Sequence, residues 1–529
     1  MRYLHSRPKS GFYGSTAHLT RLKIPMNQNK PITTKNEGEI APLIAELNAN
    51  NTSALFTDFY ELTMAQGYWK QKMDYPVVFD MFFRNNPFNS GFSVLAGIET
   101  LLDALTSFTF STEDLDYLRS LKTFEPAFID FLKDFKFSGD LYAFEEGSII
   151  FPQEPIVRVH ANLIEAQIIE GLVLNHINFQ SLIATKATRV WLASKKGSIM
   201  EFGLRRAQGP DGAMSATRAA YIGGCAGTSN TLAGRIYGIP VLGTMAHSWI
   251  MSFPTELEAF EAYAKLYPTN AIFLIDTYDT LNSGIKNAIK VGAKLVEQGH
   301  NFGVRLDSGD IQYLTTRCRE ELNKAGFPQA TIAVSNELTE QIIEQLLANG
   351  APINNWGVGT HMVTGGDASS FTGVYKLSAR HDFQGGKTLI PTMKVSDNPE
   401  KITNPGIKNV WRIYDSDNMA HADILALQDE TIPLDKETSF YHPAIDYRHF
   451  SIKPDHVENM LVKRLEKGKR IRPRLTEAET IKQSRMRMKD QLKTFDTSFQ
   501  RILNPHIYKI SLTNELKELK KKLIEERIK

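Results

Sequence analysis

The chain has 529 residues, a length that suits a large catalytic domain together with a flanking domain. Hydrophobic residues make up 42% and charged residues 23%, and the formal net charge of +2 indicates no particular partner. The two cysteines, Cys225 and Cys318, exclude a disulfide framework and suit a reducing compartment. No apolar run is long enough to span a membrane, so we expect a cytoplasmic protein without membrane or nucleic-acid partners.

The first 36 residues contain Lys and Arg but no acidic residue, and the first acid is Glu37. An acid-free, Arg-containing start is typical of an organelle transit peptide. The alternative is a disordered tail, including one that arises from a start codon assigned too early, with Met26 as the true start. We favour the tail and predict a disordered extension over residues 1–50.

Residues 51–190 are predicted to form an N-terminal α/β domain. The segment 51–70 has a helical pattern with Thr57 or Asp58 as its cap, and the apolar run 77–84 indicates a strand. The remainder mixes strand-like and helix-like segments without regular alternation.

Residues 191–400 alternate short apolar runs with helix-length segments such as 254–266 and 281–298. This alternation predicts a parallel sheet, and so many units favour an irregular α/β barrel of the TIM-barrel type over an open doubly wound sheet. The predicted strands are 198–203, 240–247, 270–279, 302–310, 330–337, 356–364 and 374–379.

Most of these runs end in polar residues, namely Arg205, His247, Asp276, Asp307, Asn336 and Thr360. Barrel enzymes build their sites at the carboxyl ends of the strands, so this placement predicts a catalytic edge.

Residues 401–529 are predicted to be a C-terminal segment that packs partly on the N-terminal domain and ends in a basic amphipathic helix over 514–529. The run 461–475 is strongly basic. A nucleic-acid or acidic-partner patch is one interpretation, but the run lacks interleaved aromatic residues, so we favour a solvated helix surface.

Anion-binding residues are concentrated between positions 201 and 310. Arg205 and Arg206 follow a predicted strand, where guanidinium groups can hold carboxylate or phosphate oxygens; a surface ion pair is the simpler alternative. His247 can serve as nucleophile, general base or metal ligand, or be structural. Asp307 and Asp310 have the spacing of a Mg²⁺ or ribose site, or of an Asp-stabilised turn.

Seven segments together resemble nicotinate phosphoribosyltransferases, and they occur in the order of that family over residues 51–450. They are TDFYELTMAQGYW (57–69), FFRNNPF (82–88), GLRRAQGPDG (203–212), SNTLAGRIYGIPVLGTMAHSW (229–249), VRLDSGD (304–310), VSN (334–336) and GVGTHMVTGGDASSFTGVYKL (357–377). The first 50 residues have no counterpart in the pattern, and the basic C-terminal segment matches it loosely.

The resemblance implies a type II phosphoribosyltransferase fold, an N-terminal α/β domain on an irregular α/β barrel, usually paired as a homodimer. It also implies an ATP-dependent, ligase-type reaction that forms a C–N bond. Nicotinate, 5-phosphoribosyl 1-pyrophosphate and ATP give nicotinate mononucleotide, pyrophosphate, ADP and phosphate in NAD salvage, with Mg²⁺ at the leaving group.

Site roles follow from the same resemblance, residue by residue. Tyr60 borders the pyridine ring, Thr244 contacts nicotinate, and His247 is the histidine that ATP phosphorylates. Arg205 binds the anionic substrates, Arg305 and Thr360 bind 5-phosphoribosyl 1-pyrophosphate, and Asp307 lies near its ribose or Mg²⁺, with Asp310 as a second candidate metal ligand. The catalytic set is therefore His247, Arg205 and Asp307.

Three other functions compete with this one. A phosphoribosyltransferase for nicotinamide is the nearest, although the form TDFYELTMAQGYW argues against it. A barrel aldolase or isomerase needs a Schiff-base lysine or a carboxylate base at a strand end, and none is in an obvious position. A non-catalytic phosphosugar-binding protein would be expected to lose His247, Arg305 or Asp307, which are all present.

Overall fold

A computed structural model of the chain describes residues 53–382, 389–398, 401–445 and 447–528. The predicted extension over residues 1–50 lies outside the described residues. Among the helices that the structure describes, none is both long enough and apolar enough to cross a membrane.

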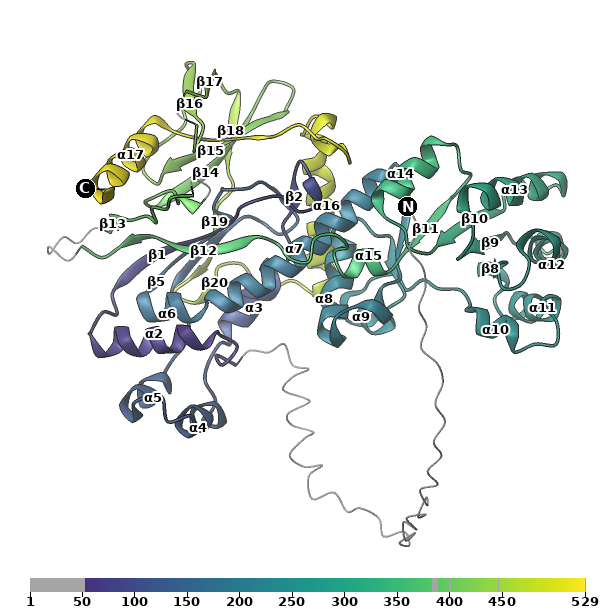
Figure 1. The fold of residues 1–529 in the computed structure, drawn as a ribbon, viewed down its shortest axis with the longest axis horizontal. Helices are drawn as coiled ribbons and strands as arrows, with labels where there is room; N and C mark the ends of the chain where they lie inside the picture. Colours follow the sequence, from purple (N-terminus) through teal and green to yellow (C-terminus); the bar gives the residue numbers. More distant parts are fainter. Residues whose placement is uncertain (1–52, 383–388, 399–400, 446, 529) are drawn as a thin grey trace, which may run out of the picture. The chain divides into compact units, whose positions relative to one another are not determined.

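One sheet is antiparallel and contains the first long strand of the chain, β1 (Pro76–Phe83), which confirms the strand predicted over 77–84. Every residue of β1 after Pro76 is buried, because helix α6 (Leu163–Ile168) packs against it. The sheet also takes in strands from late in the chain (Figure 1). Its strand order is β13 (Ile390–Pro391), β12 (Gly373–Arg380), β1, β5 (Val157–Asn162), β3 (Asp140–Ala143), β19 (Val462–Glu466) and β20 (Lys469–Arg470).

Helices surround this sheet and its neighbouring two-stranded ribbon of β2 (Ser93–Val94) and β4 (Ile149–Ile150). The predicted N-terminal helix is α2 (Phe59–Lys70), which packs on α5 and α6. The helices of this region are α3 (Ile98–Thr106), α4 (Thr112–Ser120), α5 (Pro126–Leu132) and the long α7 (Glu170–Ala193), which packs against β12.

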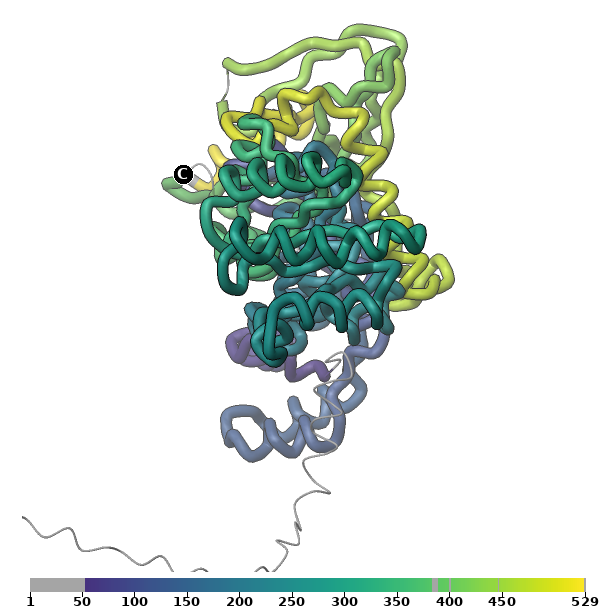
Figure 2. Tube along the Cα trace, turned by 90° about the vertical axis from the view of Figure 1, so that its right-hand side faces the viewer, coloured from purple at the N-terminus to yellow at the C-terminus, as the bar shows by residue number. Residues whose placement is uncertain are grey.

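The second sheet is parallel throughout, as the alternation of strands and helices predicts. Its strand order is β7 (Gly227–Thr228), β6 (Ser198–Glu201), β11 (Asn355–Val358), β10 (Thr331–Ser335), β9 (Phe302–Leu306) and β8 (Ala271–Leu274). The predicted helices over 254–266 and 281–298 are confirmed as α11 (Glu256–Leu266) and α12 (Ile285–Glu297). With α13 (Ile311–Lys324) they lie side by side along one flank (Figure 2).

The sheet curls as half of a barrel, and a complete TIM-type barrel is not confirmed. The edge strands β7 and β8 have no pairing with each other among the described residues. The structure therefore supports an α/β fold with a curled, open parallel sheet.

Two predicted strands of the parallel sheet are wrong. The segment 240–247 forms a single bridge, from Val241 to Thr228, and then runs irregularly into the short helix α10 (His247–Met251). Pro240 lacks an N–H group and Gly243 has no side chain to pack, so the segment is a poor strand despite its apolar residues. The run 374–379 is a strand, but it pairs antiparallel with β1 as β12, because an apolar pattern predicts a strand and leaves its partner open.

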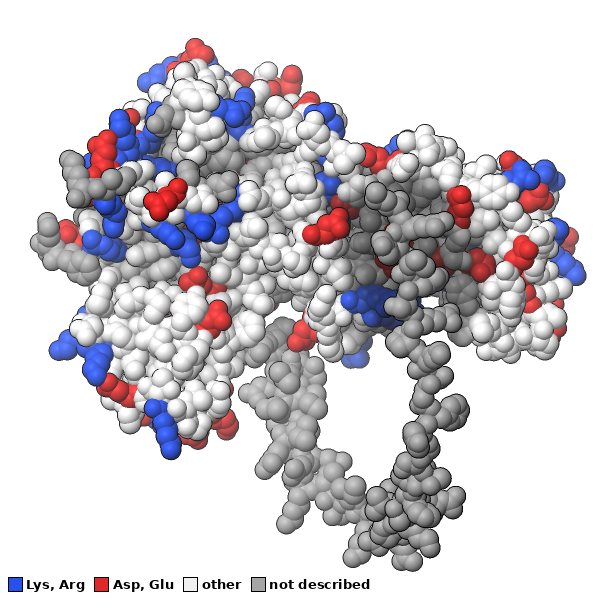
Figure 3. All heavy atoms as spheres, in the orientation of Figure 1, with Lys and Arg blue, Asp and Glu red and all other residues white. Residues whose placement is uncertain are grey.

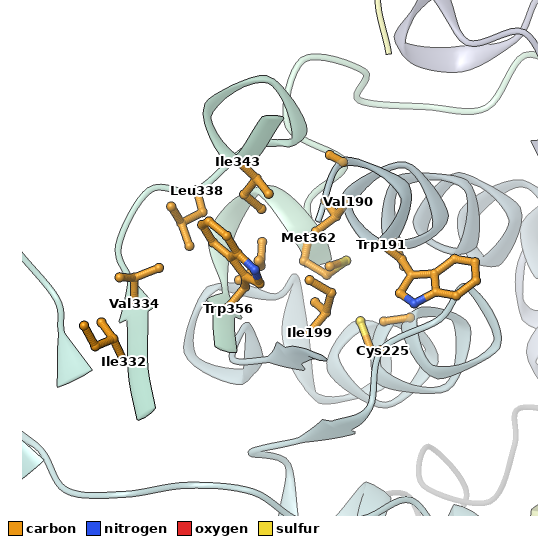
Figure 4. Packing of buried hydrophobic residues seen from close by; sticks show 14 of the residues in the cluster. Val190, Trp191, Ile199, Cys225, Ile332, Val334, Leu338, Ile343, Trp356 and Met362 are labelled. Atoms are coloured by element: carbon orange, nitrogen blue, oxygen red, sulfur yellow. The ribbon is translucent and has the colours of Figure 1, made fainter. Parts of the chain in front are cut away.

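The core of the parallel part lies between the strands and helices α7, α8 (Gly209–Ile222) and α14 (Glu340–Ala348). Trp356 on β11 is 1% exposed, and Figure 4 shows it beside Leu338 and Ile343, with Met362 and Ile199 close by. The loss of such an aromatic side chain from a core costs about 3–5 kcal/mol, so β11 is held firmly in the middle of the sheet.

The third sheet is built from residues after 400, in the order β17 (His449–Ile452), β16 (Thr438–Tyr441), β21 (Lys509–Leu512), β15 (Ala420–Leu427), β14 (Lys408–Tyr414) and β18 (His456–Asn459). The predicted C-terminal amphipathic helix is α17 (Asn514–Ile528), and it buries Leu516. The solvated helix expected over 461–475 is wrong, because this run forms β19, β20 and the turn after them.

The domain boundaries 51–190, 191–400 and 401–529 remain a prediction. The antiparallel sheet combines strands from 76–162, 373–391 and 462–470.

Candidate functional site

Polar residues meet where the parallel strands end. Arg305 lies in β9, Asp307 follows it, Ser335 is the last residue of β10, and Asp276 lies two residues beyond β8. Because β8, β9 and β10 are neighbouring parallel strands, their carboxyl ends lie at one edge of the sheet. The polar residues that follow these predicted strands therefore lie together at one edge of the sheet.

Arg305 holds the irregular segment that follows β7. Its Nη1 donates to the Thr244 hydroxyl over 2.5 Å, and its Nη2 donates to the backbone carbonyl of Met245 over 2.8 Å. Burial lowers the pKa of the Arg305 guanidinium, while Asp307 and Asp276 oppose that shift and Arg205 adds to it. The Nε of Arg305 is buried and has no hydrogen-bond partner among the described residues, so one donor is left for a ligand.

Arg205 lies in the short 3₁₀ helix η2 (Leu204–Arg206) that follows β6, and its side chain is exposed. Its positive charge helps to lower the pKa of the Arg305 guanidinium. Figure 3 shows Lys and Arg atoms gathered near helix α9 (Thr231–Tyr237) on this side of the molecule. Two guanidinium groups at one edge favour an anionic ligand.

Asp276 links the histidine to the loop after β9. Its Oδ1 lies 3.3 Å from Nε2 of His247, and its Oδ2 accepts from the backbone N–H of Asp307 at 2.9 Å and from the Ser308 hydroxyl at 2.6 Å. The Asp276 side chain is 2% exposed and that of His247 is 39% exposed. The buried carboxylate thus fixes the ring of His247, whose Nδ1 has no partner in the described part of the chain.

The two carboxylates proposed for a metal have different surroundings. Asp307 Oδ1 accepts from the Ser335 hydroxyl at 2.5 Å, and Asp310 caps helix α13 by accepting from the Tyr313 N–H at 3.0 Å. The described residues contain no group of three or more His, Cys, Asp or Glu side chains that could hold a metal ion. A cation here would need oxygens from its substrate and from water, which is how Mg²⁺ is commonly held beside phosphates.

Thr360 begins the short helix α15 (Thr360–Val363) directly after β11. Its hydroxyl donates to Glu337 over 3.3 Å, and Glu337 also lies 3.3 Å from Nε2 of His361. Gly365 and Gly366 follow with φ of +76° and +58°, a conformation that a side chain would strain. The loop after β11 therefore brings its backbone to the same edge as Arg305 and Asp307.

Tyr60 lies apart from this group. It is 49% exposed on α2, and none of its contacts among the described residues reaches Thr244 or Arg305. In Figure 1, α2 lies at the opposite end of the molecule from α10 and β9. Within one chain, the structure assembles every predicted site residue except Tyr60 near the sheet edge.

The surroundings of Tyr60 carry several acids. Its neighbour Glu61 is buried, and burial together with the nearby Glu170 raises the pKa of Glu61 to about 7. Burial and a hydrogen bond to Glu61 likewise raise the pKa of Tyr60, so its phenol stays neutral.

Comparison with known proteins matches this chain along most of its length. Residues 55–178 match the nicotinate phosphoribosyltransferase N-terminal domain, residues 198–379 the nicotinate phosphoribosyltransferase family, and residues 407–520 the nicotinate phosphoribosyltransferase C-terminal domain. The nicotinate phosphoribosyltransferase of Bacillus subtilis is 38% identical over 470 residues, which cover 88% of this chain and 94% of the relative.

The chain belongs to the nicotinate phosphoribosyltransferase family. The human nicotinate phosphoribosyltransferase is 32% identical over 88% of this chain and 95% of its own length. The crystal structure of human nicotinic acid phosphoribosyltransferase superposes with a TM-score of 0.77 at 30% identity, covering 88% of this chain and 99% of that one. The fold of this family therefore extends through all three sheets.

One buried cluster of charged residues was not predicted from the sequence. Lys186 and Arg189 on α7 both pair with Glu340 at the start of α14, each over 2.9 Å, and all three side chains are nearly fully buried. A Cβ added to Gly366 would lie 3.5 Å from the Lys186 Nζ, so the cluster adjoins the glycine turn. The available signal was a lysine and an arginine three residues apart in the otherwise apolar stretch of α7.

Proposed function

We propose that this member of the family joins nicotinate to the phosphoribosyl group of 5-phosphoribosyl 1-pyrophosphate. The products are nicotinate mononucleotide and pyrophosphate, and hydrolysis of ATP to ADP and phosphate is coupled to the reaction. The observation that supports this most strongly is the contact between Arg305 and Thr244 beside the Asp276–His247 pair.

Nicotinate is flat and carries one negative charge. The Thr244 hydroxyl and the guanidinium of Arg305 supply a polar contact and a cation in a half-buried place, where electrostatic attraction is stronger than in water. The pyridine nitrogen attacks C1 of the ribose as pyrophosphate leaves, and it needs no general base because its lone pair is already available. The side chains present accordingly bind and orient the two substrates.

The sugar substrate carries a 5-phosphate and a pyrophosphate. Arg205 and Arg305 would neutralise the negative charge that develops on the departing pyrophosphate. Thr360 and the backbone of the Gly365–Gly366 turn are proposed as further contacts to this substrate. Asp307 would help to hold Mg²⁺, which would neutralise charge on the leaving pyrophosphate, and Asp310 is a second, less available carboxylate because it caps α13.

His247 is proposed as the residue that ATP phosphorylates. Asp276 accepts from Nε2–H in the neutral ring, so the lone pair of the open Nδ1 can attack the terminal phosphorus of ATP. The N–P bond then forms as the P–O bond to ADP breaks. Hydrolysis of phosphohistidine returns the ring and releases phosphate, which couples ATP to the conformation of the neighbouring loops.

The position of Tyr60 favours a homodimer. The family resemblance gives Tyr60 a place at the pyridine ring, whereas α2, the helix that contains Tyr60, lies far from α10 in its own chain (Figure 1). Phe56, Phe59 and Met64 beside it are also partly exposed, which is typical of an interface. We propose that a second copy of the chain supplies Tyr60 to each site.

A direct experiment tests the function. The purified protein is incubated with nicotinate, 5-phosphoribosyl 1-pyrophosphate, Mg²⁺ and ATP, and the products are identified by mass spectrometry. Nicotinate mononucleotide is expected, with omission of ATP lowering turnover. No product under any condition would favour a non-catalytic phosphosugar-binding protein of the same fold.

A further inference from the structure

The basic run 461–475 lines a pocket that the proposed reaction does not use. This pocket has a volume of about 360 Å³ and lies among α3, the turn after β3, the β19–β20 hairpin and helix α16 (Glu477–Lys493). None of the proposed active-site residues lines it. Its size lies in the range of small-molecule sites in proteins.

Positive charge exceeds negative charge on the wall of this pocket. The lining includes three carboxylates, Glu99, Glu145 and Glu146. It also includes five cationic side chains, Lys463, Arg464, Arg470, Arg472 and Arg487.

A single carboxylate is shared by three of the arginines. Glu145 lies 3.5 Å from Arg464, 3.0 Å from Arg472 and 2.6 Å from Arg487. Arg464 also pairs with Glu99, whereas Arg472 and Arg487 pair only with Glu145 among the described residues. One negative charge cannot neutralise both of these guanidinium groups, and the crowded cations repel one another.

The other two acids of the lining, Glu99 and Glu146, also form ion pairs. Glu146 forms a buried ion pair with Arg218 on α8 at 2.8 Å, and Glu99 is shared between Arg464 and Arg470. Arg470 also pairs with Asp103, and Lys463 pairs with Asp140 and Glu466. The uncompensated charge is therefore greatest around Glu145.

Two of these arginines can reach a ligand. The side chain of Arg472 is 69% exposed, and only one of its nitrogens donates to the described residues. Arg487 is 27% exposed on α16. Guanidinium groups match the oxygens of phosphate through paired hydrogen bonds, and several converging groups favour more than one phosphate.

We propose that this pocket binds a small molecule that carries a diphosphate or triphosphate group, at a site separate from the proposed active site. The charged end contacts Arg472 and Arg487. The apolar side chains of Leu102 and Leu475 also line the pocket, and they would contact the organic part of the ligand. The competing explanation is that the ion pairs serve only to attach the β19–β20 hairpin to α3.

Calorimetric titration of the full-length protein with inorganic tripolyphosphate tests the proposal. All titrations use an Arg305→Ala background, so that anion binding at the proposed active site is weakened. One tripolyphosphate per chain is expected to bind, and Arg472→Gln combined with Arg487→Gln is expected to weaken it at least about tenfold. Lys482→Gln combined with Lys493→Gln, an equal loss of two positive charges at exposed positions of the same helix, is the control and should leave the affinity unchanged.

A second variant separates binding from a structural role. Glu145→Gln removes the carboxylate that competes for the three arginines, so tripolyphosphate is expected to bind more tightly. An attachment role alone predicts lower thermal stability and no gain in affinity. The proposal is overturned if tripolyphosphate does not bind, if the double arginine variant binds as well as its parent, or if Glu145→Gln fails to tighten binding.

Discussion

Arg305 donates to the hydroxyl of Thr244 over 2.5 Å and so ties the end of strand β9 to the irregular segment after β7. The same guanidinium also holds the Met245 carbonyl. A single side chain therefore positions the segment that leads directly into His247, and its remaining Nε donor is unpartnered within the described residues.

Replacement of Arg305 should be severe for activity. Arg305→Ala removes both hydrogen bonds and a desolvated cation, so kcat/KM for nicotinate is expected to fall by about 100-fold or more, equivalent to about 3 kcal/mol. Arg305→Lys should recover only part of the loss, since a single ammonium cannot reproduce the planar fork. Arg317→Ala, on the exposed side of α13, is the control. Wild-type kinetics for Arg305→Ala would remove this residue from the site.

The Asp276 carboxylate should control the coupling to ATP. Asp276→Asn replaces an acceptor with a group that can donate, which changes the ring nitrogen that carries the proton in His247. Phosphohistidine detected by mass spectrometry is expected to drop about 10- to 100-fold. His247→Ala should abolish ATP stimulation and keep a slow basal reaction. Full stimulation by ATP in the His247→Ala variant would contradict the phosphohistidine role.

A mixing experiment tests whether two chains share each site. Tyr60→Ala and Arg305→Ala homodimers are both expected to be weakly active. After subunit exchange, half of the dimers carry one intact site, so about a quarter of wild-type activity should return. A mixture that stays as inactive as its components would mean that Tyr60 acts within its own chain or outside the site.

Glu61 should make stability depend on pH. Its pKa is raised by burial to about 7 in the folded chain, so the folded state binds this proton more tightly than the unfolded state. The favourable contribution is complete below about pH 4.5 and is lost as pH rises through about 7, on the order of 2 kcal/mol. Glu61→Gln should therefore be more stable than wild type at pH 8.

The measurement for Glu61 is urea denaturation from pH 5 to pH 8. The difference between wild type and Glu61→Gln is the quantity of interest, because other groups titrate in both proteins. Glu113→Gln, at an exposed position of α4, is the control. A constant difference over this range would show that Glu61 titrates at the same pH in the folded and unfolded chains.

Local sequence patterns predicted most strands and helices of the parallel sheet. They did not predict that the sheet stays open, because they favoured a closed barrel. Strands β8, β9 and β10 are apolar runs that end in polar residues, and both features are visible in a single segment. The partner of a strand depends on contacts far away in the chain, which is why 374–379 was placed in the parallel sheet while β12 pairs with β1. The segment 240–247 has the apolar residues of a strand, but only Met245 is buried, and Pro240 and Gly243 make the segment irregular.

Most residues of the candidate site could be predicted from the sequence. Their hydrogen-bond and ion-pair partners could not. Motif order singled out Thr244, His247 and Arg305, yet the sequence gives no sign that Asp276 would hold the histidine 29 positions earlier. Lys186 was missed because a lysine near an arginine in an apolar stretch does not reveal its ion-pair partner, and Glu340 lies 154 residues away. The basic run 461–475 was misread because it forms β19 and β20, and the partner of β19 is β3, a strand far away in the chain.

The most direct test of the central claim is a competition assay for the pyridine substrate. Equal concentrations of nicotinate and nicotinamide are supplied with 5-phosphoribosyl 1-pyrophosphate, Mg²⁺ and ATP, and the two mononucleotides are separated by mass. A cation at Arg305 favours the carboxylate over the neutral amide, so nicotinate mononucleotide should exceed nicotinamide mononucleotide by about 100-fold or more. Equal amounts, or an excess of nicotinamide mononucleotide, would contradict the proposed function.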